Sequence, residues 1–166
     1  TDQLTGIFNR RVVFEALDEA MENANEAQDR EFTTIMFDID FFKHVNDTYG
    51  HAGGDAVLIS FAQLLRNEIT SPNIVGRIGG EEFLAILYLN EDQALEFCKK
   101  LIKKINSNLV NFDGTDIKIS TSGGVAFSSE TSTSADLTNK ADERLYEAKK
   151  SGRNRFQFIN SELVGD

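Results

Sequence analysis

The stretch that decides the fold is residues 74–89, which read IVGRIGGEEFLAILYL. Two apolar runs, residues 74–78 and 83–89, lie on either side of Gly79-Gly80-Glu81-Glu82. Apolar runs of this length that are bounded by glycine are typical of β-strands. Because glycine adopts positive φ without steric cost, the four residues between the runs predict a tight β-hairpin turn.

Outside this hairpin, the hydrophobic pattern predicts three more strands and four helices. The expected strands are residues 32–37, 117–127 and 155–159. Stripes of helical period begin at Val13, Val57, Leu95 and Leu137, the last after a capping residue at Ser134. A glycine-bearing loop is expected between Asn46 and Asp55. We therefore expect an α+β domain with a central five-stranded, mainly antiparallel sheet flanked by helices.

The composition predicts one globular domain without a general nucleic-acid surface. The 166 residues fit a single domain, and 13 Phe among 40% hydrophobic residues suffice for one core. The formal charge of −10 argues against a broad surface for nucleic acid or anionic membrane. Cys98, alone, excludes an internal disulfide and a Cys-rich zinc site. No apolar run approaches the roughly 18 residues of a membrane span, so we expect a cytoplasmic domain over residues 1–160, with residues 161–166 as a tail.

Two pairs of carboxylates are candidates for a cation site. Asp38 and Asp40 follow an apolar run, and alternate residues of an extended chain point to the same face. Glu81 and Glu82 are adjacent in the turn, where a cation such as Mg²⁺ would relieve their repulsion. The alternative for the first pair is solvated acids at a strand end, with an Asp that caps the next helix. The alternative for the second pair is an acidic, soluble turn. Arg77, which a plain turn does not require, stands just before the glycines.

A second group of residues points to a nucleotide. The amide of Asn46 and the carboxylate of Asp55 have the hydrogen-bonding groups to read a guanine edge. Lys149 and Arg153, at the end of the last expected helix, would clamp a triphosphate from one face. The alternatives are ordinary turn chemistry, with Asp55 opening a helix, and cations that complement a helix dipole by about 0.3–1 kcal/mol. Neither a P-loop nor a dinucleotide-binding glycine motif is present.

Taken in order, these motifs resemble the GGDEF domain of bacterial diguanylate cyclases. The signature stands here in its GGEEF form as Arg77-Ile78-Gly79-Gly80-Glu81-Glu82-Phe83. The entry motif is matched by residues 2–11, DQLTGIFNRR. The central motif is matched by Asp38-Ile39-Asp40-Phe41-Phe42-Lys43, Asn46-Asp47, Gly50-His51 and Gly54-Asp55. The closing motif is matched by Ala141-Asp142, Leu145-Tyr146, Ala148-Lys149 and Gly152-Arg153-Asn154-Arg155.

The resemblance implies a fold akin to the palm of nucleotide cyclases and polymerases, and an activity. The 3′-hydroxyl of one GTP attacks the α-phosphate of another across a homodimer of two such domains, giving cyclic di-GMP and pyrophosphate with Mg²⁺ or Mn²⁺ as cofactor. It also implies a sensor or receiver domain upstream in a parent protein, which can itself be anchored in a membrane. The alternative is a catalytically silent GTP-binding regulatory module, and the intact signature carboxylates count against it.

The resemblance also implies a role for individual residues. It implies that Asp38, the Ile39 carbonyl and Glu81 hold the metal, and that Glu82 assists the attacking hydroxyl. The implied catalytic residues are Glu81, Glu82, Asp38 and Lys43. The implied nucleotide contacts are Phe41, Phe42, Lys43, Asn46, Asp55, Arg77, Gly79, Gly80, Lys149 and Arg153. Thr70-Ser71-Pro72-Asn73 stands where many relatives carry an R-x-x-D product-inhibition site, so no inhibition by cyclic di-GMP is expected there.

Overall fold

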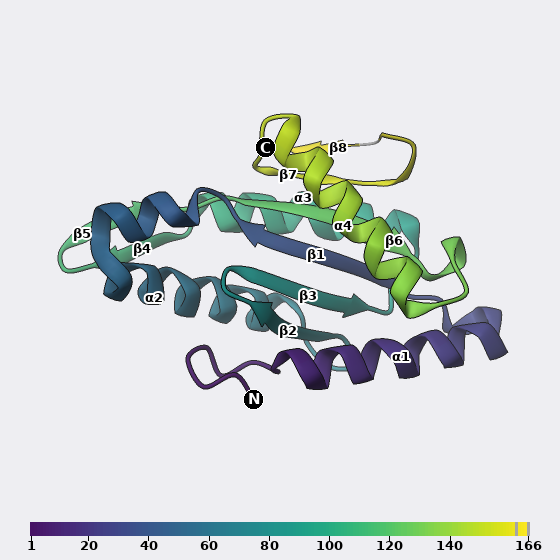
Figure 1. The fold of residues 1–166 in the computed structure, drawn as a ribbon. Coiled ribbons are helices and arrows are strands. Elements are labelled where there is room, and N and C mark those ends of the chain that lie inside the picture. Colours follow the sequence, from purple (N-terminus) through teal and green to yellow (C-terminus); the bar gives the residue numbers. More distant parts are fainter. Residues whose placement is uncertain (162, 166) are drawn as a thin grey trace.

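The structure is a computed structural model that describes residues 1–161 and 163–165. These residues form a six-stranded sheet in the order β2-β3-β1-β6-β7-β8 and a separate β4-β5 pair (Figure 1). The strands of the large sheet are β1 (Thr33–Ile39), β2 (Ile74–Gly79), β3 (Glu82–Leu87), β6 (Thr121–Phe127), β7 (Arg155–Gln157) and β8 (Leu163–Gly165). The smaller sheet pairs β4 (Leu109–Phe112) with β5 (Thr115–Lys118).

Helices cover both faces of the large sheet. Within the described residues, the α-helices are α1 (Arg10–Glu26), α2 (Phe42–Glu68), α3 (Glu91–Ser107) and α4 (Ser134–Lys150). Short 3₁₀ turns are η1 (Gln28–Arg30), η2 (Ser128–Glu130) and η3 (Ile159–Ser161). One core cluster packs α2 and α3 against the sheet, and a second packs α1 and α4. None of the helices in this part of the chain is long and apolar enough to cross a membrane.

The central strand β1 is buried along its whole length because it lies between these two layers. Its alternate residues enter opposite clusters, with Phe37 on the α2 side and Met36 on the α4 side. The Phe37 ring meets those of Phe61 and Phe156 edge-on, at centroid distances of 6.3 and 5.8 Å. These contacts hold the end of β1, from which Asp38 emerges.

Helix α4 approaches β6 at the distance of backbone contact. A Cβ added to Gly124 would lie 1.9 Å from the Ala141 carbonyl oxygen and 2.4 Å from the Leu145 nitrogen. The helix then connects β6 to β7, which pair in parallel. This packing directs the C-terminal end of α4 toward the end of β1.

The prediction of an α+β fold with a mainly antiparallel sheet is confirmed, but the strand count is wrong by one. The sixth strand, β8, pairs with β7 and lies within residues 161–166, the expected tail. Residues 162 and 166 of that tail lie outside the described residues. A strand of three residues is too short to show a period-2 pattern, so only its pairing reveals it.

The expected strand over residues 117–127 is in fact two strands. The break falls at Ile119-Ser120, where the Ser120 carbonyl accepts a hydrogen bond from the Asp40 N–H at 2.9 Å. The first part pairs with β4, which the sequence analysis missed, and the second belongs to the large sheet. Residues 155–159 are likewise a strand only as far as Gln157.

The prediction of a loop between Asn46 and Asp55 is also wrong, because both residues belong to α2, which begins at Phe42. Its helical path is interrupted only at Gly50, which has φ 76° and ψ 174°. Val45 is the buried apolar residue of this first part, so no stripe of helical period is visible there. The cap of α4 is Thr133 rather than Ser134, since the Thr133 hydroxyl accepts from the Asp136 N–H at 3.2 Å.

A buried ion pair under α4 carries the first prediction. Glu130 accepts hydrogen bonds from Arg144 at 2.5 and 2.7 Å and from the Phe127 N–H at 2.8 Å. Burial alone would raise the pKa of Glu130, but these bonds outweigh it and hold that pKa below its ordinary value of 4.5. Glu130 therefore stabilises the fold above pH 4.5, and this contribution is lost as the pH falls through the lowered pKa.

We expect Glu130→Gln to lower the free energy of unfolding at pH 7 by about 2 kcal/mol. Urea unfolding of both proteins at pH 7, 5.5 and 3.5 measures the difference. It should be equal at the two higher values and smaller at pH 3.5. A difference that grows as the pH falls would contradict the assignment.

Candidate active site

The end of β1 lies beside the hairpin turn that the sequence predicts. Asp38 is opposite Glu82 in the β1–β3 register, and the Ile39 N–H donates to the Glu81 carbonyl at 3.2 Å. Asp38 is buried, with 5% of its surface exposed. Lys149 donates a hydrogen bond from Nζ to Asp38 Oδ2 at 2.5 Å. The structure thus brings together three carboxylates and one ammonium from β1, the turn and α4.

The electrostatics of this group favour a further cation. Burial raises the pKa of Asp38; the hydrogen bond and charge of Lys149 lower it, and the charges of Glu81 and Glu82 raise it, so that the net direction is upward. A raised carboxyl pKa means that the surroundings destabilise the ionised form of that group. A bound divalent cation would reverse that effect at the same position.

The residues present fit a magnesium ion shared with a phosphate ligand. In the part of the chain that the structure describes, no three His, Cys, Asp or Glu side chains form a metal cluster of their own. Mg²⁺ is usually bound through one or two carboxylates plus waters and substrate phosphates. The side chains of Asp38 and Glu81, with the carbonyl of Ile39, are such a set of oxygen donors.

The first turn of α2 presents backbone N–H groups at the same end of the sheet. The first N–H groups of a helix have no partner within the helix, and they attract anions. Phe41 precedes this turn in a left-handed conformation, with φ 56°, and 62% of it is exposed. The guanidinium of Arg153 lies over its ring, 4.7 Å from the centroid. The exposed Lys43 follows one residue into the helix.

Lys149 and Arg153 do not share a helical face, contrary to the expectation. Helix α4 ends at Lys150, and Arg153 lies in the following loop with φ 63°. The two cations nevertheless reach the same end of the sheet, one at Asp38 and the other at Phe41.

The break at Gly50 brings Asn46 against the second part of α2. A Cβ on Gly54 would lie 1.8 Å from Asn46 Oδ1, so only glycine leaves room for this amide. Asp55 is the next residue and is exposed. The two candidate base-reading groups thus lie on the two parts of α2, on either side of its break.

The hairpin turn is confirmed, but the reason given for its glycines is wrong. Gly79 and Gly80 are not among the described residues with positive φ. A Cβ on Gly80 would meet nothing within 4 Å, so the space in front of the turn is open. Arg77 holds the turn from within, because its Nε donates to the Gly80 carbonyl at 2.9 Å and its Nη1 lies 3.3 Å from Asp2 Oδ2.

The entry motif is bound to the same hairpin. The Arg77 N–H donates to the Phe8 carbonyl at 2.9 Å, and Arg10 donates to the Ile78 carbonyl at 2.9 Å. Asp2 also accepts from the Thr5 hydroxyl and N–H at 2.6 and 2.9 Å. Residues 2–10 therefore brace the turn, and Arg77 acts here as part of that brace.

Comparison with known proteins decides the family. The family model described as "Diguanylate cyclase, GGDEF domain" matches residues 1–155. This chain belongs to that family. Diguanylate cyclase A of Treponema denticola is 32% identical over 98% of the chain, which spans 45% of that relative. Diguanylate cyclase DgcS of Shewanella oneidensis is 36% identical over 98% of the chain, which spans 53% of it.

Solved structures of GGDEF proteins have the same fold. The diguanylate cyclase SiaD of Pseudomonas aeruginosa, solved with its activator SiaC, matches with a TM-score of 0.90 and 34% identity over 95% of this chain and 61% of that one. The GGDEF domain of PA1120 from the same organism matches with a TM-score of 0.88 and 30% identity over 93% of this chain and 97% of that one. The chain thus spans about half the length of the curated relatives above, and nearly all of an isolated GGDEF domain.

Two further residues, Asp40 and Asn73, make contacts that the sequence does not predict. Asp40 does not join Asp38; its carboxylate accepts from the hydroxyls of Ser120 and Ser122 and from the Asn154 N–H. Asn73, in the position of the inhibition site, accepts from the Tyr88 N–H at 2.8 Å through its side chain. The contacts of Asp40 and of Asn73 join residues that are separated in the chain, and no sequence pattern predicts them.

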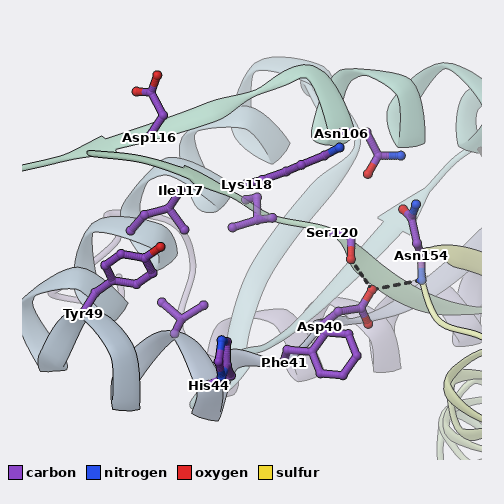
Figure 2. Close-up of a pocket in the computed structure, with 12 residues that line it drawn as sticks. Asp40, Phe41, His44, Tyr49, Asn106, Asp116, Ile117, Lys118, Ser120 and Asn154 are labelled. Atoms are coloured by element: carbon purple, nitrogen blue, oxygen red, sulfur yellow. Dashed lines mark hydrogen bonds between the residues drawn. The ribbon is translucent and has the colours of Figure 1, made fainter. Parts of the chain in front are cut away.

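A cleft of about 850 Å³ lies beside Phe41, and Asp40, His44 and Tyr49 are among the residues that line it (Figure 2). Its walls come from the residues after β1 and the first part of α2, from the end of α3, from β5 and the two residues after it, and from the loop after α4. Asp38, Glu81 and Glu82 do not line it. The cleft therefore shares Phe41 with the candidate active site, but not the three carboxylates Asp38, Glu81 and Glu82.

Proposed function

We propose that this chain is a diguanylate cyclase domain, which converts two molecules of GTP into cyclic di-GMP and two of pyrophosphate. The observation that carries the proposal is the group of Asp38, Glu81, Glu82 and Lys149 at one end of the sheet. Membership of the GGDEF family and relatives named diguanylate cyclases support it.

One set of residues binds the guanine base of GTP, and another binds its triphosphate. Asn46 and Asp55 on α2 accept and donate hydrogen bonds at the guanine edge, and a carboxylate suits the N1–H and N2–H₂ donors of guanine. Lys43, Lys149 and Arg153 neutralise the triphosphate, helped by the backbone N–H groups at the start of α2. The open space at Gly80 leaves room for phosphate against the turn.

Asp38, Glu81 and the Ile39 carbonyl would hold Mg²⁺ or Mn²⁺, which when bound neutralises phosphate charge and lowers the pKa of the attacking hydroxyl. Lys149 contacts Asp38 and has further N–H donors for a phosphate oxygen. Glu82, one residue beyond Glu81 and exposed, is placed to take the proton from the 3′-hydroxyl. Each domain holds one GTP, so bond formation requires a second domain that faces the first.

The test is incubation of the chain with GTP and Mg²⁺, at high concentration or fused to a dimerising coiled coil, with mass spectrometry of the products. We expect cyclic di-GMP and two pyrophosphates per molecule formed. Binding of 3′-deoxy-GTP, which lacks the attacking hydroxyl, is measured in parallel. Binding without turnover of GTP would support the silent regulatory module, and no binding would overturn both proposals.

Substrate choice gives the second prediction. Asp55→Ser removes the carboxylate that pairs with guanine donors, so we expect the ratio of kcat/KM for GTP over ATP to fall at least about tenfold. Steady-state kinetics with both nucleotides measure this ratio. Asp47→Ser, an exposed aspartate on the same helix, should leave the ratio unchanged. An unchanged ratio in Asp55→Ser would remove Asp55 from the base-reading pair.

A further inference from the structure

Asp40 ties the loop after α4 to the end of β1. Its Oδ2 accepts from the Ser120 hydroxyl at 2.7 Å and from the Asn154 N–H at 2.9 Å, as Figure 2 shows. Its Oδ1 accepts from the Ser122 hydroxyl at 2.6 Å. The residue is 6% exposed, so these three donors replace the water that a carboxylate otherwise needs.

The loop that Asp40 holds has a backbone that requires support. Arg153 and Asn154 have φ values of 63° and 51°, and two consecutive non-glycine residues in this region are disfavoured. The Arg153 N–H donates to the Ala148 carbonyl at 3.0 Å, and the Asn154 N–H donates to Asp40. The loop is thus held by α4 on one side and by Asp40 on the other.

The same loop sets the position of the Arg153 side chain. Its guanidinium lies 4.7 Å from the centroid of the Phe41 ring, and Phe41 is the residue directly after Asp40. Asp40 therefore fixes both members of this pair, Phe41 through the chain and Arg153 through the neighbouring Asn154 N–H. Asp38 has a different partner, since its Oδ2 accepts from Lys149.

We propose that Asp40 is a positioning residue, whose buried carboxylate holds residues 152–154 so that Arg153 lies over Phe41 and faces the triphosphate. The inference rests on the proposed function, because the contact between Arg153 and phosphate belongs to it. The two aspartates of the Asp38-Ile39-Asp40 motif then have separate tasks. Asp38 holds the metal and contacts Lys149, and Asp40 positions Arg153.

The main test uses Asp40→Asn, which keeps the shape but leaves one acceptor oxygen where two are used. We expect the Kd for 3′-deoxy-GTP to rise about tenfold, the loss expected for one contact with a charged group. The affinity for guanosine, which has no phosphate, should stay the same. A loss of both affinities in equal measure would indicate general damage to the fold and overturn the proposal.

A double-variant cycle tests whether Asp40 acts through Arg153. Arg153→Ala should weaken 3′-deoxy-GTP binding, and Asp40→Asn should add almost nothing in that background. If the losses of affinity in the two single variants multiply in the double variant, the two residues act independently and the proposal is overturned. Ser122→Ala removes one donor and should give a smaller loss of the same kind, which covers the case in which Asp40→Asn does not fold.

A control and a second readout separate this inference from the proposed function. Glu130→Gln also alters a buried carboxylate that accepts three hydrogen bonds, and it should leave the Kd for 3′-deoxy-GTP unchanged. The NMR signal of the Arg153 Nε–H should show a ring-current shift from Phe41 that Asp40→Asn abolishes. If the wild-type chain binds no 3′-deoxy-GTP, the proposed function fails, while this shift still decides whether Asp40 positions Arg153. A shift retained in Asp40→Asn would overturn the proposal.

Discussion

Glu81→Ala is expected to lower the rate of cyclic di-GMP formation by about a thousandfold. The substitution removes one of the two side-chain carboxylates proposed to hold the metal, while the groups proposed to bind guanine and phosphate lie on α2, at the end of α4 and in the loop after it. The affinity for 3′-deoxy-GTP should therefore fall much less than the turnover. Glu81 repels Asp38 electrostatically, so its removal should not destabilise the fold.

Turnover is measured by mass spectrometry of the product, and binding by calorimetry in the presence of Mg²⁺. Glu22→Ala, an exposed carboxylate on α1, is the matched control and should keep the activity of the parent chain. If Glu81→Ala retains turnover within a factor of about ten, Glu81 is not a metal ligand, because such a ligand contributes several kcal/mol of charge stabilisation.

Gly124→Ala is expected to lower the free energy of unfolding by about 3 kcal/mol or more. The new methyl carbon would lie 1.9 Å from the Ala141 carbonyl oxygen, and this obstacle is backbone that no side-chain rotation removes. Helix α4 must move away from β6 to make room. Because α4 carries Lys149, the displacement should also weaken binding of 3′-deoxy-GTP.

Urea unfolding followed by circular dichroism measures this loss. Gly80→Ala is the matched glycine control, since a Cβ there meets nothing within 4 Å and the residue has no positive φ. Its free energy of unfolding should stay within about 0.5 kcal/mol of that of the parent chain. Equal urea midpoints for Gly124→Ala and the parent chain would contradict the packing of α4 on β6.

The parts of the fold that the sequence predicted are those with a strong hydrophobic period. The hairpin around Gly79-Gly80-Glu81-Glu82 and the four helices are of this kind. The helical path of α2 between Asn46 and Asp55 was missed because Val45 is the buried apolar residue of the first part and the segment that follows is polar and rich in glycine. Strands β4 and β8 were missed because they are short and are defined by pairing rather than by pattern.

The candidate site was predictable in its chemistry and less so in its geometry. Asp38, Glu81 and Lys149 were singled out as charged groups, and the structure brings them together. The function of Asp40 was not predictable, because its partners Ser120 and Asn154 are 80 and 114 residues away. A serine hydroxyl or a backbone N–H carries no sequence signal of its partner. Only the tertiary fold determines which partner such a group has.

The contact between Asp38 and Lys149 also has a consequence for how the chain is made, because it joins residues 111 positions apart. At a synthesis rate of about 5–20 residues per second, roughly ten seconds separate the appearance of these two side chains on the ribosome. During the later part of that interval, once Glu81 and Glu82 have been made, Asp38 can have these acidic residues beside it without the Lys149 ammonium. A nascent chain is therefore poorly suited to capture nucleotide until α4 has docked, so the competence to bind GTP should arise as one of the last events of folding.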